Sequence, residues 1–262
     1  MNETQKHYIF DVDGTLTPSR GKIDPEFATW FQRFVTINTV CLVTGSDRLK
    51  TIEQIGETLF NMCDKVYNCS GNDVYRFGMP HKKSEWKLGP EHLDWLYKKL
   101  EESKWKIQTG THIEQRTGQA NYSTVGRGAT FSQRKSYYLW DQKNNERETI
   151  AKEFIERFPN LDAKVGGETG FDIFPKGKDK RQILTDFPEG DRLFFFGDRI
   201  DPAGNDYSMA QGMAQRGYRM GKWTGTGSNK SLHGEIFKVK DWQDTWEYLK
   251  YMDNRMPMYK GK

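Results

Sequence analysis

The stretch from residue 7 to residue 15 reads HYIFDVDGT and decides the fold of this chain. The run HYIFDV is apolar enough for a buried strand, and Asp11 and Asp13 lie where that strand ends. In open α/β sheets, ligands bind beyond the carboxyl ends of the strands. A step of two residues lets both aspartates face one ligand while the backbone stays extended. An ordinary Asp-Gly turn has the same letters, so the interpretation needs support from other strand ends.

Strands and helices alternate on both sides of a long central segment. After the first strand, the apolar pattern predicts a helix over 25–36, a strand over 39–44, a helix over 46–60 and a strand over 65–68. The same rhythm returns after residue 175, with a helix over 178–186, a strand over 192–197 and a helix over 241–252. Such alternation predicts a parallel sheet with crossover helices.

The central segment has a different pattern. A helix opens at Pro90, and another is predicted over 145–158. Glycine-punctuated hairpins predict short strands over 105–108, 111–116, 119–125, 162–166 and 170–174. We therefore predict one domain formed by residues 1–81 and 186–262, with an α+β cap inserted over residues 82–185.

Composition excludes several classes of protein. The 262 residues are 35% hydrophobic and 14% aromatic, which is enough for packed cores and argues against disorder. The three cysteines lack the spacing of a zinc site, and their odd number argues against a disulfide framework. The net charge of +4 is spread along the chain, so no nucleic-acid partner is expected. No apolar run is long enough to span a bilayer, and the first residues show no secretory signal, so we expect a cytoplasmic protein without a membrane partner.

Other predicted strand ends repeat the placement of polar side chains. Thr44 ends the second strand, Asp198 ends the strand over 192–197, and Asp206 follows in the next loop. Lys180 stands at the start of the helix before that strand. Clustered carboxylates repel one another unless a cation joins them. Because hard oxygen ligands of this kind select Mg²⁺, the pattern predicts a magnesium site beside a phosphoryl group held by Lys180 and Thr44.

These signatures resemble the haloacid-dehalogenase superfamily of phosphotransferases, and in more detail the eukaryotic-type phosphomannomutases. The resemblance covers nearly the whole chain, including the cap. It implies an α/β fold, with a Rossmann-like core built on a parallel sheet and an inserted α+β cap. The stretches that carry it are FDVDGTLTP over 10–18 with Arg20, R-x-G…N-x-S-x-x-G-R over 116–127 with Arg134, GG-x₃-FD-x-FP-x-G-x-DK over 166–180, and FFGD…P-x-GND over 195–206.

The resemblance implies a role for each core residue. Asp11 would be the nucleophile that forms an aspartyl-phosphate and a ligand of Mg²⁺. Asp13 would be the general acid and base for the sugar oxygen, and its backbone carbonyl would bind the metal. Asp198 would be a further metal ligand. Asp206 would either support this metal shell or make a hydrogen bond within its loop. The phosphoryl binders would be Thr44 and Lys180.

Residues of the cap would bind the sugar and the phosphate distant from Asp11. Glycines flank Arg127 on both sides and leave its guanidinium group free to clamp a phosphate. By resemblance, Arg20, Arg127 and Arg134 hold the distal phosphate, Arg116 contacts the sugar region and Asp172 binds sugar hydroxyls. The implied activity is the interconversion of mannose 6-phosphate and mannose 1-phosphate, within GDP-mannose biosynthesis. A hexose 1,6-bisphosphate would be the activator, and a homodimer would form through the cap.

The chain departs from the family pattern at several positions. Gly170 stands where the family often has a substrate-binding serine, so one contact is expected to be lost or to pass to the backbone. The family's Glu-Asn-Gly is replaced by CSGN at residues 69–72, and Gly212 stands where an aspartate is usual. We therefore expect a weakened or absent second cation site.

Two further hypotheses use the same residues. In the first, the aspartyl-phosphate is hydrolysed by water, and the enzyme is a sugar-phosphate or nucleotide phosphatase. In the second, the chain is a non-catalytic binding protein on an inherited scaffold, which the intact set of acidic residues disfavours.

Overall fold

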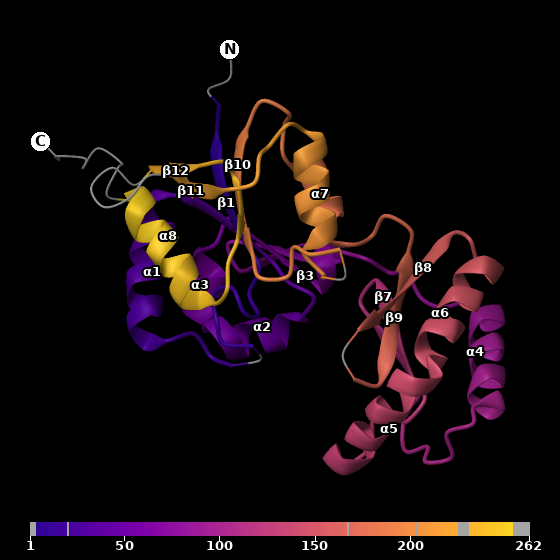
Figure 1. Cartoon of the computed structure of the whole chain (residues 1–262). Coiled ribbons are helices and arrows are strands. Elements are labelled where there is room, and N and C mark those ends of the chain that lie inside the picture. Colours follow the sequence, from indigo (N-terminus) through magenta and orange to yellow (C-terminus); the bar gives the residue numbers. More distant parts are fainter. Residues whose placement is uncertain (1–3, 20, 167, 203, 225–230, 254–262) are drawn as a thin grey trace, which may run out of the picture. The chain divides into compact units, whose positions relative to one another are not determined.

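The computed structural model describes residues 4–19, 21–166, 168–202, 204–224 and 231–253 (Figure 1). The chain divides into two compact units, residues 1–82 with 179–262 and residues 83–178. Residues 179–185, which the sequence analysis assigned to the cap, therefore belong to the first unit. Their assignment was wrong because the 3₁₀ helix Lys180–Asp186 (η2) buries Ile183 and Leu184 in the core of that unit.

A seven-stranded sheet forms the centre of the first unit, in the order β13-β10-β1-β2-β3-β4-β5. The strands β13, β10, β1, β2 and β3 run parallel, and β4 is antiparallel to β3. The predicted strands over 7–12, 39–44, 65–68 and 192–197 are all present in it. The strands are β1 (Lys6–Phe10), β2 (Thr39–Val43), β3 (Lys65–Asn68), β4 (Asp73–Arg76), β5 (Met79–Lys83), β10 (Arg192–Gly197) and β13 (Ile236–Lys238).

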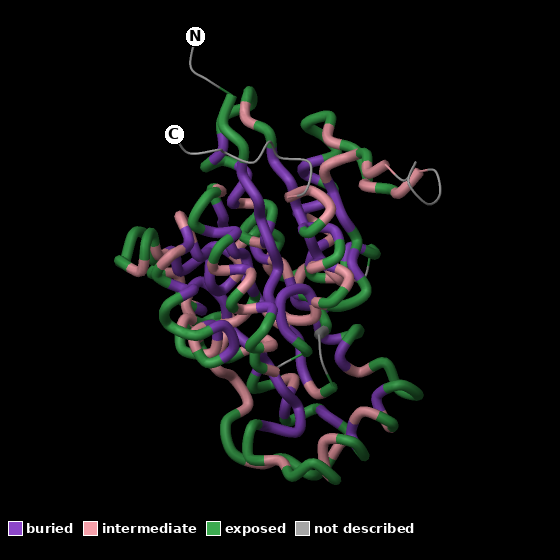
Figure 2. The backbone as a smooth tube through the Cα atoms, turned by 90° about the vertical axis from the view of Figure 1, so that its left-hand side faces the viewer, coloured by how far each residue is buried: buried purple, intermediate pink, exposed green. Residues whose placement is uncertain are grey.

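Helices cover both faces of this sheet, as a parallel sheet requires (Figure 1). Successive side chains of a strand point to opposite faces. Phe10 and Phe196 pack with residues of α1, α3 and α8, whereas Ile9 and Phe195 pack with η2 and α7. The buried backbone runs along the central strands (Figure 2). The helices are α1 (Pro25–Ile37), α2 (Arg48–Ile55), α3 (Glu57–Met62), α7 (Tyr207–Gln215) and α8 (Trp242–Asp253), and β11 (Lys222–Thr224) pairs with β12 (Ser231–His233).

Local chemistry explains where the helices begin and end. Asp24 caps α1, since its carboxylate accepts hydrogen bonds from the amides of Glu26 and Phe27. The helix predicted over 46–60 is interrupted at Gly56, and Asp47 caps its first half by accepting from the Lys50 amide at 2.8 Å. The strands β4 and β5 and the helix α7 were not predicted.

The second unit is an antiparallel four-stranded sheet in the order β6-β7-β9-β8. Its core lies between this sheet and the helices α4 and α6, where Leu96 and Phe154 pack against Tyr122 and Phe171. The elements are α4 (Pro90–Glu102), β6 (Ile113–Arg116), β7 (Gln119–Ser123), α5 (Phe131–Asn144), α6 (Glu146–Arg157), β8 (Leu161–Gly166) and β9 (Gly170–Pro175).

Two predictions for this unit differ from the structure. The predicted strand over 105–108 is absent: the segment makes no strand pairing, and the Trp105 ring packs edge-on against Tyr137 and at a tilt against Trp140. The helix α5 was not predicted, since its surface is largely polar, although Thr130 and Gln133 form a capping box at its start.

Within the described residues, no helix combines the length and the apolar character needed to cross a membrane.

Replacement of Gly170 by serine, the residue usual in the family, tests the packing of β9 against β7. A Cβ atom at this position would lie 2.2 Å from the carbonyl oxygen of Tyr122, so one of the two strands has to move. We expect Gly170→Ser to lower the free energy of unfolding by about 1–3 kcal/mol. The measurement is urea unfolding beside Gly190→Ser, whose Cβ would meet no atom within 4 Å. Equal stability of the two variants would contradict the strand packing.

Candidate active site

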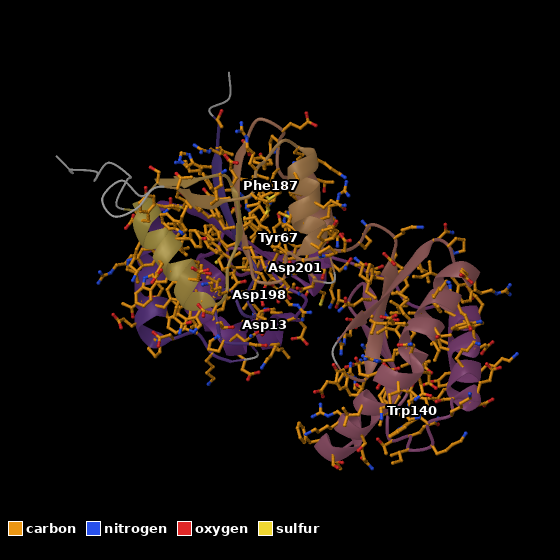
Figure 3. All side chains as sticks on the ribbon, in the orientation of Figure 1. Asp13, Tyr67, Trp140, Phe187, Asp198 and Asp201 are labelled. Carbon is orange, nitrogen blue, oxygen red and sulfur yellow. The ribbon has the colours of Figure 1, made fainter. Side chains whose placement is uncertain are left out.

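The strand order brings the predicted site residues to one end of the core sheet. Strand β1 lies between β10 and β2, and Phe10 pairs with both Phe196 and Leu42. Residues just beyond the ends of these three strands are therefore neighbours. Figure 3 shows Asp13 and Asp198 at the same end of the sheet. This is the edge at which open α/β sheets bind ligands.

Lys180 lies at the centre of this edge. Its side chain is only 1% exposed. Its Nζ donates a hydrogen bond to Oδ1 of Asp11 and another, of 2.7 Å, to Oδ1 of Asp206. Asp179 caps the 3₁₀ helix that carries Lys180, because its carboxylate accepts a hydrogen bond from the Arg181 amide. The structure therefore joins Lys180 to Asp11, 169 residues away along the chain.

Three carboxylates converge beside Lys180. One oxygen atom from each of Asp11, Asp198 and Asp206 lies within 4.8 Å of the others. The Oδ1 atom of Asp198 is buried and has no hydrogen-bond partner. The approach is close because residue 14 is a glycine, where a Cβ would lie 2.5 Å from Oδ2 of Asp198. Asp206, for which support of the metal shell and a loop hydrogen bond were the two alternatives, belongs to this group, and its Oδ2 also accepts from the Arg199 amide at 3.1 Å.

The environment of these carboxylates disfavours their charged form. Burial, followed by the charge of Asp206, raises the pKa of Asp198 to about 6. Burial and Asp206 also raise the pKa of Asp11, although Lys180 opposes this change. Burial alone would lower the pKa of Lys180, but Asp11 and Asp206 together raise it, so the ammonium group stays charged.

The residues present fit a divalent metal. Three carboxylates face one ammonium group, which leaves an excess of negative charge in a buried place. An orphaned carboxylate oxygen on Asp198 is available as a ligand. Oxygen ligands of this kind suit Mg²⁺ or another hard cation.

Ser46 links Asp13 and Thr44 in one hydrogen-bond network. The Asp13 carboxylate accepts from Nε2 of Gln54 at 2.8 Å and from the Ser46 hydroxyl at 3.4 Å. Buried Thr44 accepts the Ser46 amide at its own hydroxyl, at 3.0 Å. Sequence reasoning missed Gln54 and Ser46 as partners of Asp13; the helical spacing around Gln54 gave no sign of a polar contact.

The inserted unit carries a second charged cluster on the face of its sheet opposite the helices. Strand register sets Glu114 of β6 directly opposite Asn121 of β7, and Asn121 opposite Asp172 of β9. Two predicted arginines join this row. Arg116 binds Glu114 Oε2 at 2.6 Å, and Arg127 binds the same oxygen at 2.8 Å. Glu114 and Asn121 were not predicted, although Glu114 shares a strand face with Arg116, two residues on.

The remaining predicted arginines are Arg134 and Arg20. Arg134 is on α5, and its Nε is buried without a hydrogen-bond partner. No hydrogen bond or ion pair between described residues links it to Glu114 or Asp172. Arg20 lies outside the described residues, so its predicted contact with the distal phosphate stays a prediction.

Comparison with known proteins agrees with the sequence motifs. Residues 27–229 match the family described as "Eukaryotic phosphomannomutase". The phosphomannomutase of Spinacia oleracea is 35% identical over 210 residues, which cover 77% of this chain and 84% of that protein. The phosphomannomutase of Dendrobium officinale is 34% identical over 236 residues, covering 86% of this chain and 92% of that one.

Solved structures show the same fold at low sequence identity. The C-terminal domain of trehalose-6-phosphate phosphatase from C. albicans has a TM-score of 0.61 and 14% identity, with 96% of this chain and 92% of that chain covered. A haloacid dehalogenase-like hydrolase from Bacteroides thetaiotaomicron has a TM-score of 0.60 and 12% identity, with 95% and 100% covered. The predicted fold class, a Rossmann-like core of the haloacid-dehalogenase type, is confirmed.

Asp198→Asn tests the excess negative charge. Because the pKa of Asp198 is raised above its unfolded value, the folded protein binds this proton more tightly, and metal-free stability falls as pH rises through about 6. We expect the variant in a chelator at pH 7.5 to melt about 2–4 °C higher than the wild type, the shift produced by roughly 1 kcal/mol. Its decline with pH should also be smaller, because only Asp11 then keeps a raised pKa in the cluster, and added Mg²⁺ should stabilise the variant less.

The matched control is Asp201→Asn, because Asp201 is an exposed aspartate of the same loop and pairs with Lys238 at 2.7 Å. Differential scanning calorimetry measures both variants. A lower melting temperature for metal-free Asp198→Asn would contradict the charge excess.

Proposed function

This chain belongs to the eukaryotic phosphomannomutase family, and on that premise we propose that it interconverts mannose 6-phosphate and mannose 1-phosphate through an aspartyl-phosphate on Asp11 and a bound hexose 1,6-bisphosphate. The observation that carries the proposal is the buried contact of Lys180 with Asp11 and Asp206, beside Asp198. A carboxylate that accepts a phosphoryl group needs nearby positive charge, and this arrangement has an ammonium group in place and a pocket of oxygen ligands for a cation.

The contacts of Asp11 support its role as the phosphoryl acceptor. Lys180 engages Oδ1, whereas among the described residues Oδ2 accepts a hydrogen bond only from the Thr15 hydroxyl, at the long distance of 3.5 Å. Oδ2 is thus the oxygen that attacks phosphorus. Its new P–O bond forms as the bond between phosphorus and the sugar oxygen breaks. Lys180 and Thr44 hold the phosphoryl oxygens, and they keep the group in line for the transfer.

Asp13 acts as the general acid and general base for the sugar oxygen. In the first transfer it donates a proton to the departing oxygen, and in the return transfer it removes a proton from the hydroxyl that attacks the aspartyl-phosphate. Gln54 and Ser46 orient its carboxylate for both steps. Mg²⁺, held by Asp11, Asp198 and the Asp13 carbonyl, supplies neutralisation of the phosphoryl charge when it is bound.

The second phosphate distinguishes a mutase from a phosphatase. A mutase binds its bisphosphate intermediate in two orientations, so it needs side chains that bind the phosphate that is not reacting. Arg127 and Arg134 of the inserted unit, with Arg20, are the groups we assign to this phosphate. Arg116 and Asp172 are assigned to the sugar. The cluster that joins Arg116, Arg127 and Asp172 supports this division, because cations and hydrogen-bond acceptors for hydroxyls lie side by side.

The direct test is incubation with mannose 1-phosphate, Mg²⁺ and a catalytic amount of hexose 1,6-bisphosphate. We expect mannose 6-phosphate to accumulate, without a matching release of inorganic phosphate. The assay quantifies the mannose 6-phosphate formed, and inorganic phosphate is measured in parallel. Asp11→Asn should abolish the reaction, since an amide oxygen does not form a stable phosphoryl ester.

Phosphate release without isomerisation would show that the enzyme is a phosphatase instead. Turnover by Asp11→Asn at the wild-type rate would remove Asp11 from the nucleophile role. The control variant is Asp64→Asn, because Asp64 lies at the opposite, amino-terminal end of the parallel strands and pairs with Arg76 at 3.1 Å.

A further inference from the structure

We propose that Glu114 is a positioning residue of the sugar-phosphate site: its carboxylate fixes the guanidinium groups of Arg116 and Arg127 in the orientation in which they receive substrate. The inference rests on the proposed function, since it concerns the substrate-binding arginines of that site. It assigns a role to an acidic residue that carries none of the predicted chemistry.

The carboxylate of Glu114 lies between the guanidinium groups of Arg116 and Arg127 and contacts both. Its Oε2 accepts from Nε and Nη2 of Arg116, at 3.2 and 2.6 Å. The same oxygen lies 2.8 Å from Nη2 of Arg127. The two arginines stand on different segments, Arg116 at the end of β6 and Arg127 in the loop after β7. One carboxylate oxygen therefore sets the spacing of two groups that the backbone alone leaves independent.

Arg127 is held from a second side as well. Its Nη2 donates to Oδ1 of Asn121 at 2.8 Å, and Nδ2 of Asn121 donates to Oδ1 of Asp172 at 2.8 Å. Nη1 of Arg116 lies 3.8 Å from the same Asp172 oxygen. The five side chains thus close a ring in which every charged group has an opposite neighbour. A ring of this kind restricts long side chains that would otherwise sample many rotamers.

The ring leaves donors for a ligand. Glu114 and Asn121 both use Nη2 of Arg127, and Glu114 uses Nε and Nη2 of Arg116. Among the described residues, no hydrogen bond engages Nη1 or Nε of Arg127 or brings an acceptor within hydrogen-bond distance of Nη1 of Arg116. A guanidinium group with one side fixed by protein and another side open is arranged for planar recognition of a phosphate or of vicinal hydroxyls.

Glu114 keeps its charge while it is partly open to solvent. Its side chain is 42% exposed. Partial burial would raise the pKa of its carboxyl, but Arg116 and Arg127 outweigh this effect and lower the pKa. A surface ion pair of this exposure contributes little to folding. Its effect is therefore expected on the arrangement of the arginines and on substrate binding, with little effect on stability.

The opposite role is also testable. If Glu114 merely competed with substrate for the two guanidinium groups, its removal would improve binding. If Glu114 positions them, its removal leaves both arginine side chains mobile. Ordering them on binding then reduces the binding free energy of the substrate. The two roles change KM in opposite directions.

The experiment compares Glu114→Ala and Glu114→Gln with the wild-type enzyme on mannose 1-phosphate. The matched control is Glu153→Ala, because Glu153 belongs to the same unit, is 43% exposed and pairs with Lys99 at 2.6 Å. We expect Glu114→Ala to raise KM about tenfold, the effect of about 1.4 kcal/mol, and to leave kcat within about twofold. Glu114→Gln keeps an acceptor oxygen and should raise KM less. Hydrolysis of p-nitrophenyl phosphate, which lacks a distal phosphate, should be unchanged.

A double-mutant cycle shows whether Glu114 acts through its partner. The KM of Glu114→Ala/Arg127→Ala should exceed that of Arg127→Ala by clearly less than tenfold, because only Arg116 is then left for Glu114 to position. An additive rise in KM, an unchanged KM or a lower KM for Glu114→Ala would overturn the proposal. If the alanine variant unfolds, the glutamine variant decides: a raised KM supports the inference, and a wild-type or lower KM overturns it.

Failure of the proposed function gives a different result. In that case the wild-type enzyme forms no mannose 6-phosphate at all. Calorimetric dissociation constants of mannose 1-phosphate for the same variants then test Glu114 without the reaction, with the same tenfold weakening expected.

Discussion

The buried ammonium group of Lys180 is the constraint on which the rest of the core depends. A charge at 1% exposure is tolerated only when partners surround it, and here Asp11 and Asp206 bind it directly. These partners come from the end of β1 and from the loop after β10, so both strands must end at one level. The register that pairs Phe10 with Phe196 provides this alignment. Asp198 then adds negative charge that Lys180 does not balance, and this imbalance is what makes the site a place for a divalent cation.

The inserted unit also brings charged side chains together, but it does so on the face of an antiparallel sheet. There the pleat of an antiparallel sheet aligns Glu114, Asn121 and Asp172 in one row across three strands. Apolar residues at the alternate positions, such as Tyr122 and Phe171, anchor that sheet to its helices. Core packing on one face of the sheet thereby fixes the positions of Glu114, Asn121 and Asp172 on the other face. Each unit holds its own set of charged groups: the first has three acids around one ammonium group, and the second has a ring of two arginines with their acceptors.

Sequence reasoning reached the core site because strand ends in a parallel sheet are predictable neighbours. Asp11, Thr44 and Asp198 follow recognisable strands, and Lys180 stands at the start of the predicted helix before the strand that Asp198 ends. It failed where contacts depend on register or on helix rotation. Glu114 and Asn121 become neighbours only when β6 pairs with β7, and Gln54 reaches Asp13 from a helix whose polar face looks solvated. The cap boundary was placed too late because the run of residues 179–185 reads as an ordinary surface helix, although Lys180, Ile183 and Leu184 are buried.

The central claim is that this buried set of charges makes Asp11 the acceptor of a phosphoryl group. The most direct measurement is mass spectrometry of the enzyme after brief incubation with hexose 1,6-bisphosphate and Mg²⁺, quenched in acid and digested. The account predicts one added phosphoryl group on the peptide that contains Asp11, with none when Mg²⁺ is chelated. Phosphorylation of a different residue, or rapid isomerisation with no phosphorylated enzyme in any quenched sample, would contradict it.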